Sequence, residues 1–382
     1  MRKLLWLLLV LYAPLTVAQS SFTFDVARGP HPVGLRAVNQ YDDSRTYART
    51  APAPPISRPI QTLIWYPATV SDKPMRFREY AEFSVSQTDF KQTPEAIQAA
   101  FRELLKSLPL KAEHLDFELA RVQWATRDAP ALAGKFPVVI YAPSVGGAAY
   151  ENTDLCELLA SHGYVVLSSH SPGKDDDGMT MDRPGIDLQV GDIHFLMKYA
   201  ARIAQADTRR MAIVGYSWGG ISNAFAAVDK PDVRALVFLD GSIRYFTGLI
   251  EDNQLNRGER FAIPMLYFSS GNAAFKDEKG KIETGATLLA RLTSGKRYSL
   301  RMDRMSHADF GSLTIRQIPP EGYKSATPQE VSAGYGWMAR YTQQFLDAAL
   351  KGDRKAGAFM DKSPAANNVP AAIMSAIELT KP

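Results

Sequence analysis

A Gly-x-Ser-x-Gly pentapeptide at residues 215–219 is the feature that most limits how this chain can fold. It directly follows an apolar run at 211–214, which predicts a buried strand, and precedes a segment at 221–227 that predicts a helix. The flanking glycines allow a sharp turn that leaves the side chain of Ser217 exposed at the edge of a sheet. The backbone N–H of Trp218 would then face the place where an oxyanion forms. The pattern predicts an α/β fold that carries a nucleophilic serine.

A nucleophilic serine needs a general base, and the order of residues along the chain limits the choice. In folds with this strand–turn–helix motif, the serine comes first, then an acid, then a histidine. The chain has 6 histidines, and only His307 follows Ser217. His307 lies just past a predicted strand at 298–302, where the reactive groups of open α/β sheets gather. The sequence therefore predicts His307 as the base by elimination.

Two aspartates are candidates for orienting the imidazole of His307. Asp240 ends an apolar strand and is followed at once by a glycine turn, which fixes its position. Asp277 lies in a run of charged residues that is typical of a solvated loop. An orienting carboxylate must be held still and shielded from water, so we favour Asp240 and keep Asp277 as the alternative. Asp309 is expected to face away from His307 or to cap a turn.

This constellation resembles the platelet-activating-factor acetylhydrolase family, the plasma and intracellular type II branch of the α/β-hydrolases. That family places the acid one strand early, as Asp240 would be, and the interval from Ser217 to Asp240 is similar. The likeness covers residues 135–355 and includes the segments 136–141, 158–166 and 307–310. Bacterial relatives described as dienelactone-hydrolase-like share the segments 33–36 and 64–67. True dienelactone hydrolases use a cysteine nucleophile, so the serine in this chain argues against that activity.

The resemblance also implies the second donor of an oxyanion hole. The family carries His-Gly after the strand that ends near residue 141, whereas this chain has Pro143 and Ser144. The backbone N–H of Val145 matches the family's donor, so the proline, which has no N–H, does not remove it. Two glycines follow at 146 and 147 and keep a close approach of the backbone possible. We therefore expect Val145 and Trp218 to supply the two N–H groups.

The rest of the chain predicts one α/β-hydrolase domain at 19–361 between two terminal segments. Arg2 and Lys3 precede an uninterrupted apolar stretch at 4–11, which predicts a cleaved signal peptide at 1–18. Residues 362–382 are expected to form a C-terminal tail. Alternating strands and helices predict a mostly parallel central sheet flanked by helices. The strands are expected near 22–67 (an N-terminal β region), 137–141, 164–169, 211–215, 234–240, 264–269 and 298–302.

Three helices are predicted by their apolar periodicity. One covers 184–204, before the pentapeptide, and another covers 335–350 and closes the domain at Gly352. The third covers 94–108, inside a helix-rich insertion at about 84–130 that shows no strand pattern. This insertion either lines the substrate pocket or is a peripheral decoration.

Composition excludes several classes of function. A net charge of +4 on 382 residues gives no basic field for nucleic acid. The single cysteine, Cys156, has the spacing of a buried helix residue, and we expect it in the core. No metal-ligand or nucleotide-binding motif is present, so no cofactor and no metal are expected.

These features predict an exported serine hydrolase, periplasmic or secreted, that cleaves carboxylic esters through Ser217, His307 and Asp240. Its substrate would be a small-molecule or lipid ester, and the resemblance implies short-acyl, phospholipid-like esters with transient contact to a membrane surface. One alternative is a general carboxylesterase or amidase on small molecules or polyesters. The other is a non-catalytic binding protein with a hydrolase fold. The oligomeric state is left open.

Overall fold

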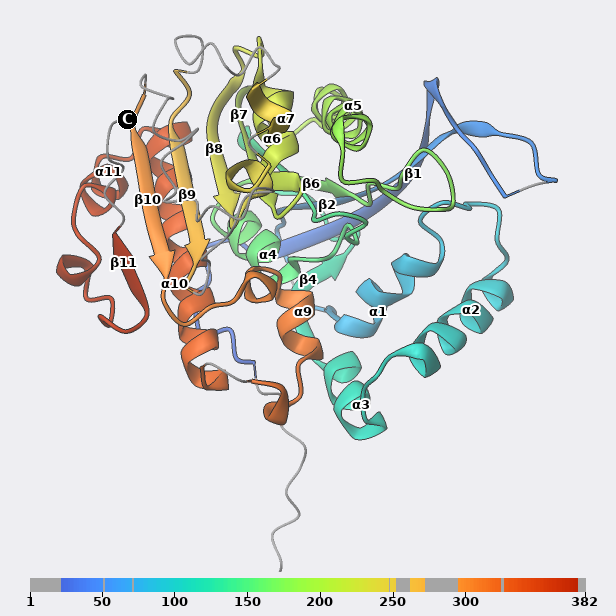
Figure 1. The fold of residues 1–382 in the computed structure, drawn as a ribbon, viewed down its shortest axis with the longest axis horizontal. Helices are drawn as coiled ribbons and strands as arrows, with labels where there is room; N and C mark the ends of the chain where they lie inside the picture. The colour runs from blue at the N-terminus through green and yellow to red at the C-terminus, as the bar shows by residue number, and fades with distance from the viewer. Residues whose placement is uncertain are drawn as a thin grey trace, which may run out of the picture.

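An eleven-stranded sheet forms the centre of the molecule, which we describe from a computed structural model (Figure 1). The structure describes residues 22–376 apart from 51, 71, 247, 252–261, 272–294 and 324–325. The predicted signal peptide and Asp277 lie outside the described residues. The strand order is β11-β10-β9-β8-β7-β5-β6-β2-β1-β4-β3.

The predicted core strands are confirmed, and each is parallel to its neighbour among them. Their bounds are β5 (Phe136–Ala142), β6 (Val165–Ser169), β7 (Ala206–Tyr216), β8 (Val233–Leu239), β9 (Met265–Ser270) and β10 (Arg297–Met302). Most of their residues are buried because helices cover both faces of the sheet, as parallel sheets require. Their carboxyl ends therefore meet at one edge, where side chains from separate strands come together.

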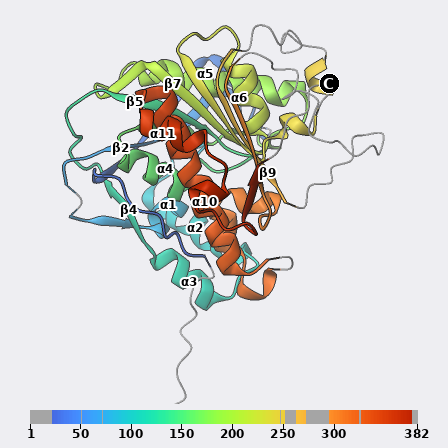
Figure 2. The same cartoon turned by 90° about the vertical axis from the view of Figure 1, so that its left-hand side faces the viewer.

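Two pairs of helices cover the sheet (Figure 2). On one face, α4 (Thr153–Ser161) and α10 (Pro328–Leu346) bury residues such as Leu158 and Met338. On the other face, α5 (Arg183–Ala200) and α6 (Gly219–Ala227) bury residues such as Ile193 and Ile221. The remaining short elements are η2 (Ser242–Arg244), α7 (Gly248–Glu251), η5 (His307–Phe310), α9 (Ser312–Gln317), η6 (Pro320–Gly322), η7 (Asp347–Lys351), α11 (Arg354–Met360) and η8 (Ala365–Asn367).

The N-terminal β region is a long antiparallel pair that extends the sheet. It consists of β1 (Val33–Tyr47) and β2 (Ile56–Pro67), and β2 pairs with β6. Two further strands, β3 (Pro74–Arg76) and β4 (Val122–Arg127), follow at this edge. The expectation of no strand within 84–130 is wrong for β4. Strand β4 has only six residues, and three of them are buried. So few buried positions do not produce an apolar pattern that can be recognised in the sequence.

The insertion, together with the residues just before it, contributes helices at the carboxyl edge of the sheet. These are α1 (Phe77–Ala81), η1 (Glu82–Val85), α2 (Pro94–Ser107) and α3 (Ala112–Ala120). In Figure 1 they lie beside α9, on the side toward which β9 and β10 point. The guanidinium of Arg316 on α9 joins them to the core, since it reaches Glu118 on α3 at 3.2 Å and Asp154 on α4 at 2.5 Å. Whether the insertion lines a substrate pocket stays a prediction.

The C-terminal part differs from expectation in two places. Helix α10 starts at Pro328, earlier than the predicted 335, because Thr327 and Glu330 form a capping box. Its end near Gly352, which has a φ of 67°, agrees with the prediction. The expected tail at 362–382 is wrong for residues 374–376, which form β11 (Met374–Ala376) antiparallel to β10. In the described ranges, no helix is both long and apolar enough to cross a membrane.

Candidate active site

Ser217 occupies a strained turn between β7 and α6. Its φ is +51°, a left-handed value that is unusual for a residue with a side chain. The backbone around it is held by Ser217 N–H donating to Leu239 O at 3.2 Å and by Ser242 N–H donating to Ser217 O at 2.7 Å. A Cβ on Gly219 would lie 2.1 Å from Ala142 O, so only glycine allows this turn to pack against the end of β5. The Gly-x-Ser-x-Gly segment thus forms the predicted tight turn.

Asp240 directly follows β8 and is fully buried. Its φ is also positive, at +43°. One carboxylate oxygen, Oδ1, accepts hydrogen bonds from Ser270 N–H at 3.0 Å and from the Tyr245 hydroxyl at 2.8 Å. The other oxygen, Oδ2, lies 2.7 Å from Nδ1 of His307. Two fixed donors therefore leave one oxygen of Asp240 for the imidazole.

His307 completes a line of three side chains. It begins η5, just after β10, and its Nε2 lies 2.8 Å from Ser217 Oγ. The Tyr216 hydroxyl donates to the backbone oxygen of His307 at 3.0 Å and fixes the loop. The His307 side chain is 40% exposed, whereas that of Asp240 is 0% exposed. The imidazole thus has a buried carboxylate on one side and an accessible hydroxyl on the other.

The other acidic candidates do not join this line in the described structure. Asp277 lies outside the described residues. Asp309 caps the turn of η5, because its Oδ2 accepts from the backbone N–H and the hydroxyl of Ser306 at 2.6 Å and 2.8 Å. This agrees with the expected role of Asp309 as a turn cap.

The two predicted oxyanion donors lie on adjacent segments. After β5, a turn is closed by Gly147 N–H donating to Ser144 O at 2.9 Å, with Gly146 at a φ of +64°. Val145 lies in this turn and is 37% exposed. Trp218 directly precedes α6. Across the described part of the chain, neither of their backbone N–H groups has a hydrogen-bond acceptor, so both are free for a ligand.

Sequence reasoning missed two side chains that hold this turn. Glu151 accepts from Ser144 N–H at 2.9 Å and also from the Ser144 hydroxyl. His170, at the end of β6, has its Nδ1 2.9 Å from Gly147 O. Burial raises the pKa of Glu151 to about 7, although its hydrogen bonds with Ser144 oppose that rise. Nothing in the sequence around Glu151 sets it apart from its polar neighbours Asn152, Thr153 and Asp154.

Tyr245, the hydroxyl donor to Asp240, was missed as well. It lies five residues beyond Asp240, where nothing in the sequence sets it apart from a packing aromatic.

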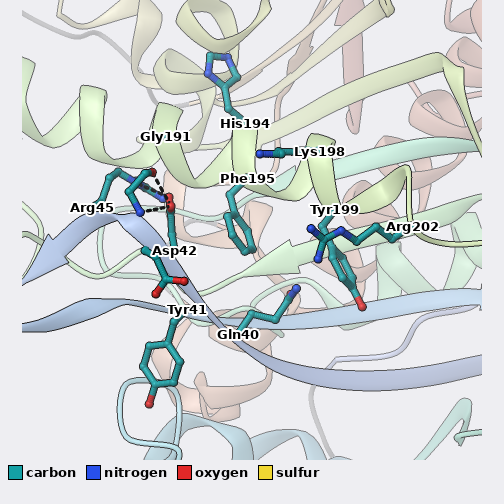
Figure 3. Close-up of a pocket in the computed structure, with 12 residues that line it drawn as sticks. Gln40, Tyr41, Asp42, Arg45, Gly191, His194, Phe195, Lys198, Tyr199 and Arg202 are labelled. Atoms are coloured by element: carbon teal, nitrogen blue, oxygen red, sulfur yellow. Dashed lines mark hydrogen bonds and ion pairs between the residues drawn. The ribbon is translucent and has the colours of Figure 1, made fainter.

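A large hollow in the described structure lies elsewhere (Figure 3). It has a volume of about 720 Å³ and lies between β1 and α5. Its walls include Asp42 and Arg45, which form an ion pair at 2.6 Å, and none of the three aligned side chains lines it. This hollow is therefore a feature separate from the Ser217 site.

The thiol of Cys156 is buried in α4, as expected, and burial raises its pKa. It is therefore unsuited to nucleophilic chemistry. Within the residues that the structure describes, no cluster of histidine, cysteine and acidic side chains is arranged to hold a metal ion.

Comparisons with known proteins agree with this fold. A sequence model of the dienelactone hydrolase family matches residues 124–275, which include Ser217 and Asp240 but end before His307. A protein of Methylorubrum extorquens, provisionally named a carboxymethylenebutenolidase, is 29% identical over 122 residues. That match covers 29% of this chain and 42% of the relative. A ferulic acid esterase structure from Streptomyces cinnamoneus has a TM-score of 0.65 at 18% identity, covering 93% of this chain and 99% of that one.

Proposed function

We propose that this protein is a serine esterase that hydrolyses carboxylic esters through an acyl-enzyme. The observation that carries the proposal is the continuous line from Ser217 Oγ through His307 to Asp240, with contacts of 2.8 Å and 2.7 Å. A serine hydroxyl becomes a nucleophile only when a base accepts its proton, and the base needs an orienting group. All three roles are filled by adjacent side chains here.

The geometry supports the following sequence of steps. His307 Nε2 accepts the proton of Ser217 as Oγ attacks the carbonyl carbon of the ester. Asp240 holds the imidazole with its N–H at Nδ1 and stabilises the imidazolium that forms. The N–H groups of Val145 and Trp218 stabilise the oxyanion of the tetrahedral intermediate. His307 then protonates the leaving alcohol and activates the water that releases the acid.

The comparisons favour esters and limit what else can be proposed. The partial match to the dienelactone hydrolase family and the two relatives, whose names describe ester or lactone chemistry, support an ester substrate. A cysteine-dependent reaction of the dienelactone hydrolase type is not proposed, because serine occupies the turn and Cys156 is buried in α4.

The finer assignment concerns substrate and location. We propose short-acyl esters, including phospholipid-like ones reached by transient contact with a membrane surface, because the sequence resembles the acetylhydrolase family. We also propose export to the periplasm or the medium, on the basis of residues 1–18. A panel of p-nitrophenyl esters and acetylated phospholipids tests the first, and the N-terminal sequence of the native protein tests the second. Faster cleavage of long acyl chains, or an uncleaved N-terminus, would contradict them.

A covalent probe tests the central proposal without knowledge of the substrate. A fluorophosphonate should form an adduct with the protein, and peptide mapping should place that adduct on Ser217. Ser217→Ala should abolish both labelling and p-nitrophenyl acetate hydrolysis, and Cys156→Ala should keep both. Absence of an adduct on the folded protein would favour the non-catalytic binding protein instead.

A further inference from the structure

Glu151 is a buried carboxyl group that lies between two parts of the Ser217 site. It is 5% exposed, and among the described residues it has no ion-pair partner. A buried acid without a cation is costly unless donors satisfy its oxygens. Glu151 has such donors, and its contacts join the oxyanion turn to the loop that carries His307.

The side chain of Glu151 holds the oxyanion turn at its first residue. Its two oxygens receive the hydroxyl and the backbone N–H of Ser144, the residue directly before Val145. The Tyr141 hydroxyl donates at 3.2 Å to Glu151 Oε2, the oxygen that also accepts from Ser144 N–H. A Cβ on Gly147 would lie 2.7 Å from Glu151 Oε1, so the turn closes directly over the carboxyl group. With Ser144 fixed at two atoms, the direction of the next N–H, that of Val145, is also fixed.

The backbone of the same segment holds the histidine loop. Leu313 N–H donates to Glu151 O at 3.0 Å. The neighbouring Asn152 donates from Nδ2 to Phe310 O at 2.9 Å and accepts at Oδ1 from Ser312 N–H at 3.1 Å. Phe310 ends η5, the short helix that His307 begins. One dipeptide thus contacts both the segment before the Val145 N–H and the segment after the base.

We propose that Glu151 is a positioning residue that fixes the Val145 N–H relative to His307 and Ser217. This inference rests on the proposed function, because it concerns the oxyanion of the same reaction. Its action is through geometry: the carboxyl group accepts from Ser144 and does not touch the substrate. The donor is then already aimed before the oxyanion forms, which is the condition under which such donors lower a barrier most.

The chain offers a matched control in Glu157, six residues further along. It is also a buried carboxyl group that accepts two backbone N–H groups, from Trp124 at 2.7 Å and Ala125 at 3.2 Å, and a hydroxyl, from Tyr80 at 2.7 Å. Its partners lie on α1 and β4 and not in the oxyanion turn. Substitution of Glu157 therefore reproduces the loss of a buried acid without disturbing Val145.

The test compares kcat and KM for p-nitrophenyl acetate in Glu151→Ala, Glu151→Gln and Glu157→Ala, each corrected for the folded active fraction. Loss of a whole oxyanion donor costs about 10²- to 10³-fold in kcat, so a misdirected donor should cost about 10- to 100-fold in Glu151→Ala. KM should change little, since the donor acts on the transition state. Glu151→Gln keeps an acceptor for Ser144 N–H and should recover most of kcat. Glu157→Ala should lower stability but leave kcat unchanged.

Three results would overturn the proposal: an unchanged kcat in Glu151→Ala, an equal loss in Glu157→Ala, or no recovery in Glu151→Gln. If Glu151→Ala does not fold, His170→Leu removes the contact at the other end of the oxyanion turn, at Gly147 O. That substitution should also lower kcat by about 10- to 100-fold. An unchanged kcat in His170→Leu would count against the proposal that the position of this turn controls the reaction. Failure of the esterase proposal itself is distinguishable, because the wild-type protein would then neither hydrolyse the ester nor react with a fluorophosphonate at Ser217.

Discussion

Replacing Asp240 by asparagine should disable the site while leaving the fold intact. The two donors to Oδ1, Ser270 N–H and the Tyr245 hydroxyl, require an acceptor at that position. The amide oxygen of the new side chain will therefore occupy it, and the amide NH₂ will face Nδ1 of His307 at the place of Oδ2. The NH₂ group donates a hydrogen bond, so the imidazole must carry its proton on Nε2. That tautomer cannot accept the proton of Ser217.

The size of the effect follows from these contacts. Turning the amide over would leave the buried Ser270 N–H without an acceptor, at a cost of about 1–3 kcal/mol. At the upper value, only about one molecule in 150 would hold the productive tautomer. Loss of the negative charge beside the imidazolium removes about 1.5–3 kcal/mol more. Together these effects amount to about 2.5–6 kcal/mol and predict a loss of about 10²- to 10⁴-fold in kcat.

The assay is steady-state hydrolysis of p-nitrophenyl acetate, with thermal unfolding measured in parallel. Asp240→Asn should unfold within a few degrees of the wild-type protein, because the amide keeps both donors satisfied. Asp277→Asn is the control, since that residue is the alternative acid suggested by the sequence. A large loss in Asp277→Asn together with near-normal turnover in Asp240→Asn would refute the assignment.

Three further predictions concern stability, each measured by chemical denaturation. Gly220→Ala should prevent a native fold, because the new Cβ would lie 2.4 Å from the backbone of Gly241. Gly357→Ala, in α11 with open space around it, should instead stabilise the protein by about 0.5–1 kcal/mol. Equal effects of the two substitutions would refute the steric argument. Burial raises the pKa of Glu157 from 4.5 to about 7, so the folded protein binds this proton more tightly and the free energy of unfolding should fall as pH rises through that range. Glu157→Gln should reduce this fall in the free energy of unfolding by about 3 kcal/mol. A pH profile identical to that of the wild-type protein would contradict the prediction. Arg316→Ala leaves the buried carboxylate of Asp154 without its cation, whereas Glu118 keeps its contact with Arg121. The loss should be about 3–5 kcal/mol, so a loss below about 1 kcal/mol would show that the buried ion pairs contribute little.

The central sheet could be predicted because buried parallel strands leave a strong trace in the sequence. Strands β5, β6, β8 and β9 are covered on both faces and therefore appear as largely apolar runs, as does the second half of β7. The short strands at the rims, β4 and β11, have few inward residues and gave no comparable signal. The early start of α10 did have a signal, the Thr327 and Glu330 capping box, but a search based on apolar periodicity passes over it.

The reactive side chains could be located from chain order, but their supports could not. Ser217 and His307 follow from a motif and an elimination, and Asp240 follows from the rigid end of its strand. The contacts of Glu151 and Tyr245 depend on segments that come together only after folding, such as Leu313 with Glu151. The sequence around each partner does not indicate such a contact, because nothing in its own segment sets that partner apart from its neighbours.

The lengths of β3 and β11 have a consequence for how this molecule behaves among its own copies. In the described sheet these two outermost strands contain only three residues each, and β3 begins with a proline. An unpaired margin of a sheet can recruit a strand from another molecule, and short or proline-bearing margins suppress that recruitment. The two outermost strands are therefore poor templates for growth of the sheet from one molecule to the next.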